Sequence, residues 1–150
     1  MLIWTFNDGG RATAGYKGET RDCVCRAIAI ATGRSYAEVY RHLNQLGESE
    51  RRIKRGRSSA RTGVYKQTYA MFLREIGWEW IPTMRIGSGC TVHLRADELP
   101  TDRPLIVSVS KHLTTMMYGV IHDTHDPSRD GTRCVYGYWQ PTAGATANRR

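Results

Sequence analysis

Long apolar runs are missing from this chain of 150 residues. A membrane-spanning helix needs roughly 20 consecutive apolar residues, and no stretch of the sequence approaches that length. The opening "MLIWTFNDGGRA" also lacks the basic head and the apolar stretch of about 7 to 15 residues that a secretory signal has. We therefore expect a cytoplasmic protein without a membrane segment.

Cysteine is scarce, with four residues: Cys23, Cys25, Cys90 and Cys134. Because thiols are kept reduced in the cytosol, free thiols or ligands are favoured over disulfides at all four positions. The single residue between Cys23 and Cys25 is shorter than the spacer of common zinc hooks, and no second hook accompanies the pair. We expect neither a metal nor a cofactor.

The composition is typical of one globular domain. The chain is 40% hydrophobic and 24% charged, with the two kinds of residue interleaved throughout. Its length is sufficient for a single core. We therefore expect one domain over residues 1–150 without internal repeats, ending in a flexible tail over residues 141–150.

Positive charge is concentrated in the basic loop, which we define as residues 50–61, "ERRIKRGRSSAR". Such a cluster can bind an acidic partner or nucleic acid, although a solvated loop is the more ordinary reading. No aromatic residue is interleaved to stack on bases, which weakens the case for single-stranded nucleic acid. The candidate contact residues are Arg51, Arg52, Lys54, Arg55 and Arg57.

Helical patterns fill the first half of the chain after an irregular, glycine-rich start. We predict helices over residues 23–33, 35–47 and 62–77. Gly33 stops the first helix, and Ser35 with Glu38 forms a capping box for the second. The second half has a period of two and predicts strands over 78–84, 90–94, 104–110, 112–118, 120–126 and 133–139. This order predicts an α+β domain with N-terminal helices packed on a C-terminal antiparallel sheet.

Cys23 lies at the mouth of the first predicted helix, just after two candidate capping residues, Thr20 and Asp22. Unpaired backbone N–H groups and the helix dipole stabilise a thiolate there, which makes the thiol a better nucleophile. Cys25 lies about 200° further around the helix, so one thiol can react while the other packs. The alternative is that Cys23 is a small buried hydrophobic residue, as most free cysteines are.

A hairpin in the second half places a histidine beside a carboxylate. A two-residue loop at Tyr118-Gly119 puts Asp123 opposite Thr114, and Asp123 is then a diagonal neighbour of His112 on one side of the sheet. His112 can serve as a base for a thiol, with Asp123 orienting its ring. A loop one residue longer would reverse these faces.

Nearby ligand-type residues offer alternatives to this pair. His125 falls directly across from His112 and competes for the role of base, whereas His122 faces away. Asp126 lies opposite Lys111 and, standing before Pro127, fits a turn. Neighbouring side chains on a strand diverge, so a metal cluster in "HDTHD" is disfavoured.

An early helical cysteine, then a histidine on a strand, then an acidic residue on the next strand is the order of catalytic groups in papain-like cysteine peptidases. The chain resembles this superfamily through "DCVCRAIAIATG", "SKHL" and "VIHDTHDPS". It also resembles a family of uncharacterised bacterial and phage proteins with a "DCxxRAIAIATG" opening and a "GVIHDTxDPS" segment. The resemblance implies a papain-like fold, with Cys23 as nucleophile, His112 as base and Asp123 as orienting residue.

One departure from the papain-like pattern concerns the oxyanion hole. Lys17 stands where these enzymes have a glutamine. The backbone N–H of Cys23 can supply one donor, with Asn7, Thr20 or a neighbouring amide supplying the other. Loss of one such donor costs about 2.7 to 4 kcal/mol of transition-state stabilisation.

Three functions therefore follow from the sequence. The first is a thiol hydrolase that cleaves peptide or isopeptide bonds in a peptide or protein substrate through a Cys-His-Asp triad. The second is a weak or inactive binding module of the same fold, such as an inhibitor or interaction protein. The third, less favoured, is a nucleic-acid binder that uses the basic loop.

Overall fold

The computed structural model describes residues 3–17, 21–49, 59–61 and 63–142, and within them it confirms the α+β class. The basic-loop residues Arg51, Arg52, Lys54, Arg55 and Arg57 lie outside these ranges. Most of the predicted tail does too. None of the described helices is long and apolar enough to cross a membrane. The elements in chain order are β1 (Ile3–Phe6), α1 (Cys23–Thr32), α2 (Tyr36–Ser49), α3 (Lys66–Glu75), β2 (Trp78–Pro82), β3 (Pro104–Val109), β4 (His112–Met117), β5 (Val120–Asp123) and β6 (Gly137–Pro141).

The strands form one mixed sheet in the order β1-β5-β4-β3-β6-β2. Every neighbouring pair is antiparallel except β1 and β5, which are parallel and pair Ile3 with Val120. The prediction of an irregular start and a purely antiparallel sheet is therefore wrong. The run "IWTF" is only four residues long, and its partner lies more than 100 positions away, so no local pattern reveals the pairing.

Three of the predicted strands differ from the structure. Residues 90–94 form no strand, and His93 makes only an isolated bridge with Cys134. β5 ends at Asp123, because the chain turns at Asp126, whose carboxylate accepts a hydrogen bond from the Ser128 N–H at 3.0 Å. β6 begins at Gly137 and continues to Pro141, the first residue of the predicted tail.

The β4–β5 hairpin has the predicted register. Met117 pairs with Val120, and Thr115 pairs with His122. The two loop residues, Tyr118 and Gly119, have φ of 51° and 82°. Positive φ at both loop positions is the geometry of a tight hairpin whose twist matches that of its strands. The predicted placement of Asp123 beside His112 depends on this register.

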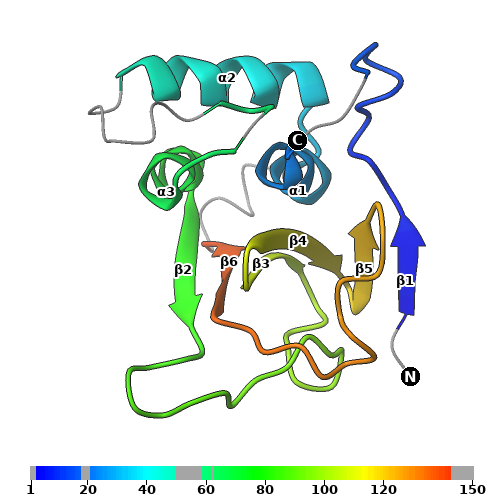
Figure 1. Ribbon diagram of the computed structural model, residues 1–150, viewed down its shortest axis with the longest axis vertical. Helices are drawn as coiled ribbons and strands as arrows, with labels where there is room; N and C mark the ends of the chain where they lie inside the picture. The colour runs from blue at the N-terminus through cyan, green and yellow to red at the C-terminus, as the bar shows by residue number, and fades with distance from the viewer. Residues whose placement is uncertain (1–2, 18–20, 50–58, 62, 143–150) are drawn as a thin grey trace.

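Two helices lie on one face of the sheet, α1 over β3 and β4 and α3 beside β2, and α2 packs on the side of α1 and α3 that is away from the strands (Figure 1). α1 is buried along most of its length, and the Thr115 hydroxyl donates to the Ala27 carbonyl at 2.8 Å across the layer. As predicted, Gly33 ends α1 in the left-handed conformation, and the Glu38 N–H donates to the Ser35 hydroxyl at 3.1 Å. α1 is therefore held firmly, with its N-terminus at the edge of this layer.

The other face of the sheet is covered by loop segments. Along β3, Ile106 packs with the helices, whereas Leu105 and Val107 face a second cluster, as the period of two requires. The long connection between β2 and β3 contributes Leu94 and Leu99 to that cluster, and the segment before β6 contributes Val135. The sheet is thus buried on both sides by parts of the chain distant in sequence.

Candidate active site

The three predicted site residues stand at the ends of three elements. Cys23 is the first residue of α1, His112 the first of β4 and Asp123 the last of β5. Cys23 and His112 line one open cleft of about 430 Å³. Asp123 lies behind His112 and is 3% exposed. The structure therefore brings all three groups together.

The imidazole of His112 is oriented by Asp123. The His112 Nε2 and Asp123 Oδ2 atoms lie 2.7 Å apart. The Thr114 hydroxyl donates to the same oxygen at 2.6 Å, and the Thr124 N–H donates to Oδ1 at 2.7 Å. Because the carboxylate holds Nε2, the Nδ1 atom of His112 is the ring nitrogen that can serve a thiol.

The electrostatics favour a charged pair between Cys23 and His112. Burial raises the pKa of the Cys23 thiol, but hydrogen bonding to His112, its positive charge and the Leu113 amide together bring that pKa below its usual value. Burial lowers the pKa of His112, and Asp123 and Cys23 outweigh this effect and raise it to about 9. A thiolate facing an imidazolium is the reactive form of a cysteine nucleophile.

Asp123 remains ionised in this setting. Burial raises the pKa of its carboxyl, whereas hydrogen bonds from His112 and Thr114 and the positive charge of His112 lower it, and the net effect is a pKa below the usual value. A charged, buried acceptor is what a catalytic imidazolium requires on its far side.

Cys25 differs from Cys23 as the helix geometry predicts. Its side chain is fully buried, and its Sγ lies 3.8 Å from the Tyr36 carbonyl oxygen. Burial raises the pKa of Cys25 to about 12. Of the two thiols on α1, Cys23 alone lines the cleft, so the division into one accessible and one packed thiol is confirmed.

Arg26 lies behind the site and links two buried carboxylates, Asp22 and Asp123. The sequence analysis did not identify Arg26 as a site residue. Its guanidinium pairs with the fully buried Asp22, and its Nη2 lies 3.6 Å from Asp123 Oδ1. Asp22 also accepts a hydrogen bond from the Tyr36 hydroxyl at 2.5 Å and lies 3.5 Å from Arg11 Nε. The sequence feature that could have indicated the pair is the spacing of four residues between Asp22 and Arg26, which places the two side chains next to each other on a helix.

Asp22, one of the two candidate capping residues, does not cap α1 with its side chain. Asp22 occupies the N-cap position of α1, but its side chain makes no capping hydrogen bond. Its carboxylate is already held by Arg26 and the Tyr36 hydroxyl. The other candidate, Thr20, lies outside the described residues.

Two further histidines, His122 and His125, lie near the site, but neither contacts Asp123 as closely as His112 does. The His125 ring centre lies 5.1 Å from that of His112, and its Nδ1 lies 3.8 Å from Asp123 Oδ1, but its side chain is 56% exposed. His122 faces away, as predicted, and its Nδ1 lies 3.2 Å from the Asn7 side-chain nitrogen. Ligand atoms of His112, Asp123 and His125 lie within 4.8 Å of one another, yet Asp123 already occupies His112 Nε2.

Asn7 is not placed to complete an oxyanion hole. Its side-chain oxygen accepts from the Gly9 N–H at 2.8 Å and its nitrogen faces His122. Asn7 is absent from the residues that line the cleft, whereas Val24 belongs to them. The first N–H groups of a helix have no partner within it, so the amides of Cys23 and Val24 are the candidate donors.

The rim of the cleft is basic. Arg21, Lys66 and Lys111 line it with exposed side chains, and none of its described lining residues is acidic. The remaining lining residues that offer side chains to a substrate are mostly apolar or aromatic, including Val64, Tyr69 and Tyr136. A substrate with negative charge near the bond to be attacked fits this rim.

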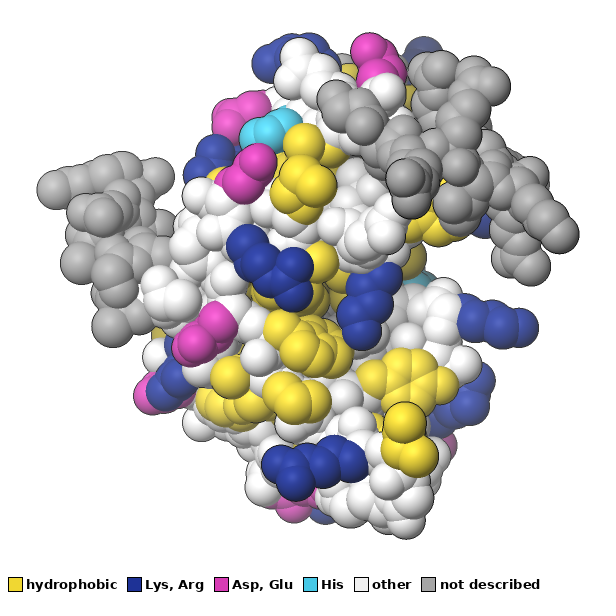
Figure 2. All heavy atoms as spheres, turned by 90° about the vertical axis from the view of Figure 1, so that its left-hand side faces the viewer, with side chains coloured by type: hydrophobic (Ala, Val, Ile, Leu, Met, Phe, Trp, Pro, Cys, Tyr) yellow, Lys and Arg dark blue, Asp and Glu magenta, His cyan; other side chains and the backbone are white. Residues whose placement is uncertain are grey.

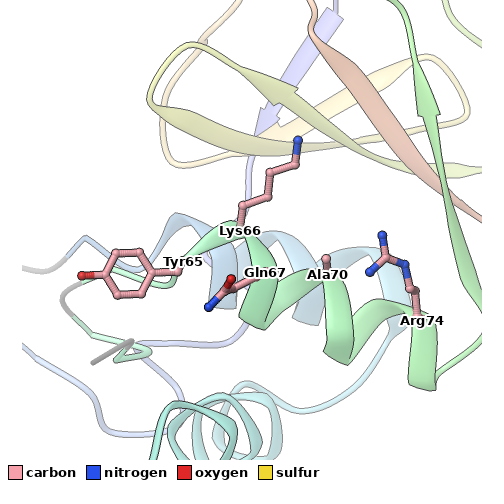
Figure 3. A pocket seen from close by; sticks show the side chains of 5 residues that line it. All are labelled: Tyr65, Lys66, Gln67, Ala70 and Arg74. Carbon is pink, nitrogen blue, oxygen red and sulfur yellow. The ribbon is translucent and has the colours of Figure 1, made fainter. Parts of the chain in front are cut away.

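A second hollow of about 550 Å³ on α3 shares Lys66 with the cleft. Figure 3 shows Lys66 and Arg74 pointing from α3 toward the sheet. The Lys66 ammonium lies 4.6 Å from the Trp80 ring centre, and Arg74 lies 5.5 Å from that of Trp139. Basic and hydrophobic side chains alternate over this face of the molecule (Figure 2). The basic surface therefore extends from the cleft along α3.

The predicted states of the cysteines are only half right. Cys23 and Cys25 are free, but Cys90 and Cys134 form a disulfide across 44 positions, so the expectation that no disulfide would form is wrong for this pair. The physical reason is the pairing of the two backbone segments at His93 and Cys134, which places the sulfurs together. No spacing rule indicates that pairing.

Comparisons with known proteins add no family to this geometry. No protein-family model, no curated protein and no solved structure matches the chain. The α+β architecture is shown by the structure itself.

Proposed function

We propose that this chain is a papain-like thiol hydrolase that cleaves peptide or isopeptide bonds by acyl transfer. The observation that supports this most directly is the convergence of three groups: Cys23 at the start of a buried helix, His112 in the same cleft, and Asp123 at 2.7 Å from His112 Nε2. An accessible thiol, a base and an orienting carboxylate are the parts that such chemistry needs.

In the proposed mechanism the Cys23 thiolate attacks the carbonyl carbon of the substrate. The carbonyl oxygen becomes an oxyanion, which the amides of Cys23 and Val24 stabilise. The imidazolium of His112 gives its Nδ1 proton to the leaving nitrogen as the C–N bond breaks, which leaves a thioester on Cys23. Water then gives a proton to His112 and its oxygen to the acyl carbon, and the thiolate is released.

Asp123 and Arg26 are assigned supporting roles in this mechanism. Asp123 fixes the ring orientation of His112 and stabilises its positive charge. Arg26 connects Asp123 to the buried Asp22 and thereby holds the carboxylate in place. Arg26 is therefore a positioning residue, whereas Cys23 and His112 are the catalytic ones.

Alkylation of the thiols tests this proposal. The chain is treated with iodoacetamide near pH 7 and the modified residue is identified by mass spectrometry. We expect Cys23 to react at least about tenfold faster than a free model thiol, because its pKa is lowered. Cys25 is the internal control and is expected to stay unmodified, because it is buried and its pKa is raised to about 12.

Two results contradict the proposal. One is a Cys23 that reacts no faster than the model thiol. The other is a His112→Ala variant with an unchanged Cys23 rate, because the lowered pKa depends on that imidazole. Cleavage of a fluorogenic peptide set, with acidic and basic members compared, then separates hydrolysis from thiol reactivity alone.

A binding module of the same fold is the second candidate, and the oxyanion hole is the observation that favours it. Lys17 is exposed where papain-like enzymes have glutamine, and the Asn7 side chain is engaged by Gly9 and His122. A Cys23→Ala variant that retains the biological effect of the chain supports this candidate over the hydrolase. Nucleic-acid binding through the basic loop stays a prediction, since its candidate contact residues, Arg51, Arg52, Lys54, Arg55 and Arg57, lie outside the described residues.

A further inference from the structure

A second cluster of cysteine and histidine lies outside the cleft. It consists of Cys90 and His93, in the long connection between β2 and β3, and Cys134, shortly before β6. The two sulfurs and a ring nitrogen of His93 all lie within 4.8 Å of one another, and Cys90 Sγ lies 3.5 Å from His93 Nε2. The structure has the two cysteines joined as a disulfide.

Backbone pairing, independent of the disulfide, holds the cluster together. His93 and Cys134 form an antiparallel bridge. The Leu94 N–H donates to the Arg133 carbonyl and the Val135 N–H to the Val92 carbonyl, each at 2.9 Å. The side chains of Leu94 and Val135 are fully buried in the hydrophobic cluster on the face of the sheet away from the helices. The two cysteines therefore remain neighbours when the S–S bond is reduced.

Glu98 prepares His93 to act as a ligand. One carboxylate oxygen of Glu98 accepts from the His93 backbone N–H at 2.9 Å and lies 3.2 Å from its Nδ1. Arg95 Nε lies 3.4 Å from the other oxygen. A carboxylate on Nδ1 fixes the proton there and leaves the lone pair of Nε2 toward the sulfurs, which is how ligating histidines are oriented in zinc sites.

We propose that the reduced chain binds one Zn²⁺ through Cys90 Sγ, His93 Nε2 and Cys134 Sγ. With the usual Zn–S and Zn–N bond lengths, ligand atoms in a tetrahedral site stand roughly 3.5 to 3.8 Å apart. The distance of 3.5 Å between Cys90 Sγ and His93 Nε2 fits this spacing. Because Cys90 is exposed, the fourth position is open to water or to an external ligand.

The oxidised and zinc-bound forms exclude each other. Two molecules of a low-molecular-weight thiol such as glutathione reduce the disulfide, giving two protein thiols and one oxidised glutathione. Zn²⁺ then displaces one proton from each thiol and binds both thiolates. In either form the cluster ties the connection between β2 and β3 to the segment before β6. This inference is independent of the proposed hydrolase activity.

Metal titration of the reduced chain tests the site. The full chain is reduced, stripped with a chelator, freed of both reagents without oxygen, and titrated with Co²⁺ and then Zn²⁺. We expect one Co²⁺ per chain with a thiolate-to-cobalt charge-transfer band, and loss of that band as Zn²⁺ displaces the cobalt. The oxidised chain is expected to show no such band, because both sulfurs are bonded to each other.

Variants assign the ligands. Cys90→Ser, Cys134→Ser and His93→Ala are expected to weaken binding at least 100-fold, and Glu98→Gln about 10- to 100-fold. Cys23→Ser is the matched control and is expected to bind as the parent chain does, because Cys23 lies in the cleft instead.

Two results overturn the proposal. The first is a reduced parent chain without a thiolate-to-cobalt band at micromolar protein. The second is a band that survives Cys90→Ser but is lost in Cys23→Ser. Should a cysteine variant fail to fold, protection mapping on the parent chain decides the question. Zn²⁺ must then slow the alkylation of Cys90 and Cys134 and leave the rate at Cys23 unchanged, and equal rates at all three refute the site.

Discussion

Among the residues that the structure describes, a cysteine, a histidine and a carboxylate lie together in two places, and the two sets differ in burial. In the cleft, Cys23 and His112 are backed by Asp123, which is 3% exposed. In the second set, Cys90 and His93 are backed by Glu98, an exposed residue. The distance from histidine nitrogen to carboxylate oxygen is 2.7 Å in the first set and 3.2 Å in the second.

The difference shows what environment adds to a fixed set of functional groups. In a buried setting charges interact more strongly, so Asp123 and Cys23 together raise the pKa of His112 to about 9 despite the cost of burial. At the second set, solvent screens the carboxylate and another cysteine, Cys134, stands within bonding distance. The first set therefore favours a single activated thiol, and the second favours a bond between two sulfurs or to a metal.

The largest expected effect separates the two histidines. His112→Ala is expected to reduce kcat/KM for any hydrolysed substrate by at least about 10³-fold, since triad members act as a unit. His93→Ala is expected to leave kcat/KM within about threefold, because His93 lies outside the cleft. Steady-state kinetics on the two variants, with circular dichroism to verify folding, makes the comparison.

A comparable loss in both histidine variants would break the distinction between the sets. It would mean that the second set is needed for the structure of the cleft. A full rate in His112→Ala would instead leave His125 as the base, the competitor that lies across the hairpin.

The next effect concerns stability in place of activity. The disulfide closes a loop between positions 44 apart, so Cys90→Ser combined with Cys134→Ser is expected to lower the free energy of unfolding by about 2 to 4 kcal/mol in oxidising buffer. Cys23→Ser is expected to change it by less than about 1 kcal/mol, because that thiol borders solvent. Urea denaturation of the parent chain, the double variant and Cys23→Ser measures the free energy of unfolding of each. An equal decrease in the two variants would show that the disulfide does not stabilise the fold.

The third effect is on pH dependence. The pKa of His112 is raised to about 9, so its proton is present below that pH and is lost as the pH rises through it. The pKa of Cys23 is lowered, so the thiolate forms as the pH rises through that lower value. Hydrolysis is therefore expected to rise on the acid side, hold across neutral pH and fall near pH 9.

Asp123→Asn sharpens this prediction, with Glu98→Gln as its control. Removing the charge beside His112 is expected to lower the pKa of its imidazole by about one unit or more, so the alkaline limb of the profile moves down. Glu98→Gln is expected to leave the profile in place. NMR titration of the imidazole protons measures the pKa directly, and an unmoved His112 in Asp123→Asn would refute the role given to the carboxylate.

Local patterns were sufficient for the parts of the site that one stretch of sequence encodes. The turn at Tyr118-Gly119 fixes the hairpin register, and the register alone predicts that Asp123 lies beside His112, as it does in the structure. In the same way, the apolar run after Cys23 indicated a buried helix whose first turn is the accessible part. Both arguments depend on fixed backbone geometry over a few residues.

Contacts between distant segments could not be predicted in this way. The pairing of β1 with β5, the Cys90–Cys134 bond and the contact of Arg26 with Asp123 each join residues that no short-range period relates. Each arises only when the fold brings distant segments of the chain together. The resemblance to papain-like enzymes did not indicate them either, because its motifs cover only the helix start and the hairpin.

The smallest effect tests whether His125 takes part at all. His125 shares Asp123 with His112, but at 3.8 Å and with an exposed ring. His125→Ala is therefore expected to change kcat/KM by less than about threefold and to leave the alkylation rate of Cys23 at pH 7 unchanged, since an exposed, screened charge has little influence on its neighbours. Parallel alkylation of the parent chain, His125→Ala and His112→Ala provides the scale. If the alkylation rate of Cys23 falls as far in His125→Ala as in His112→Ala, the two imidazole rings act as a pair. The buried set would then contain two functional histidines, whereas the exposed set contains one.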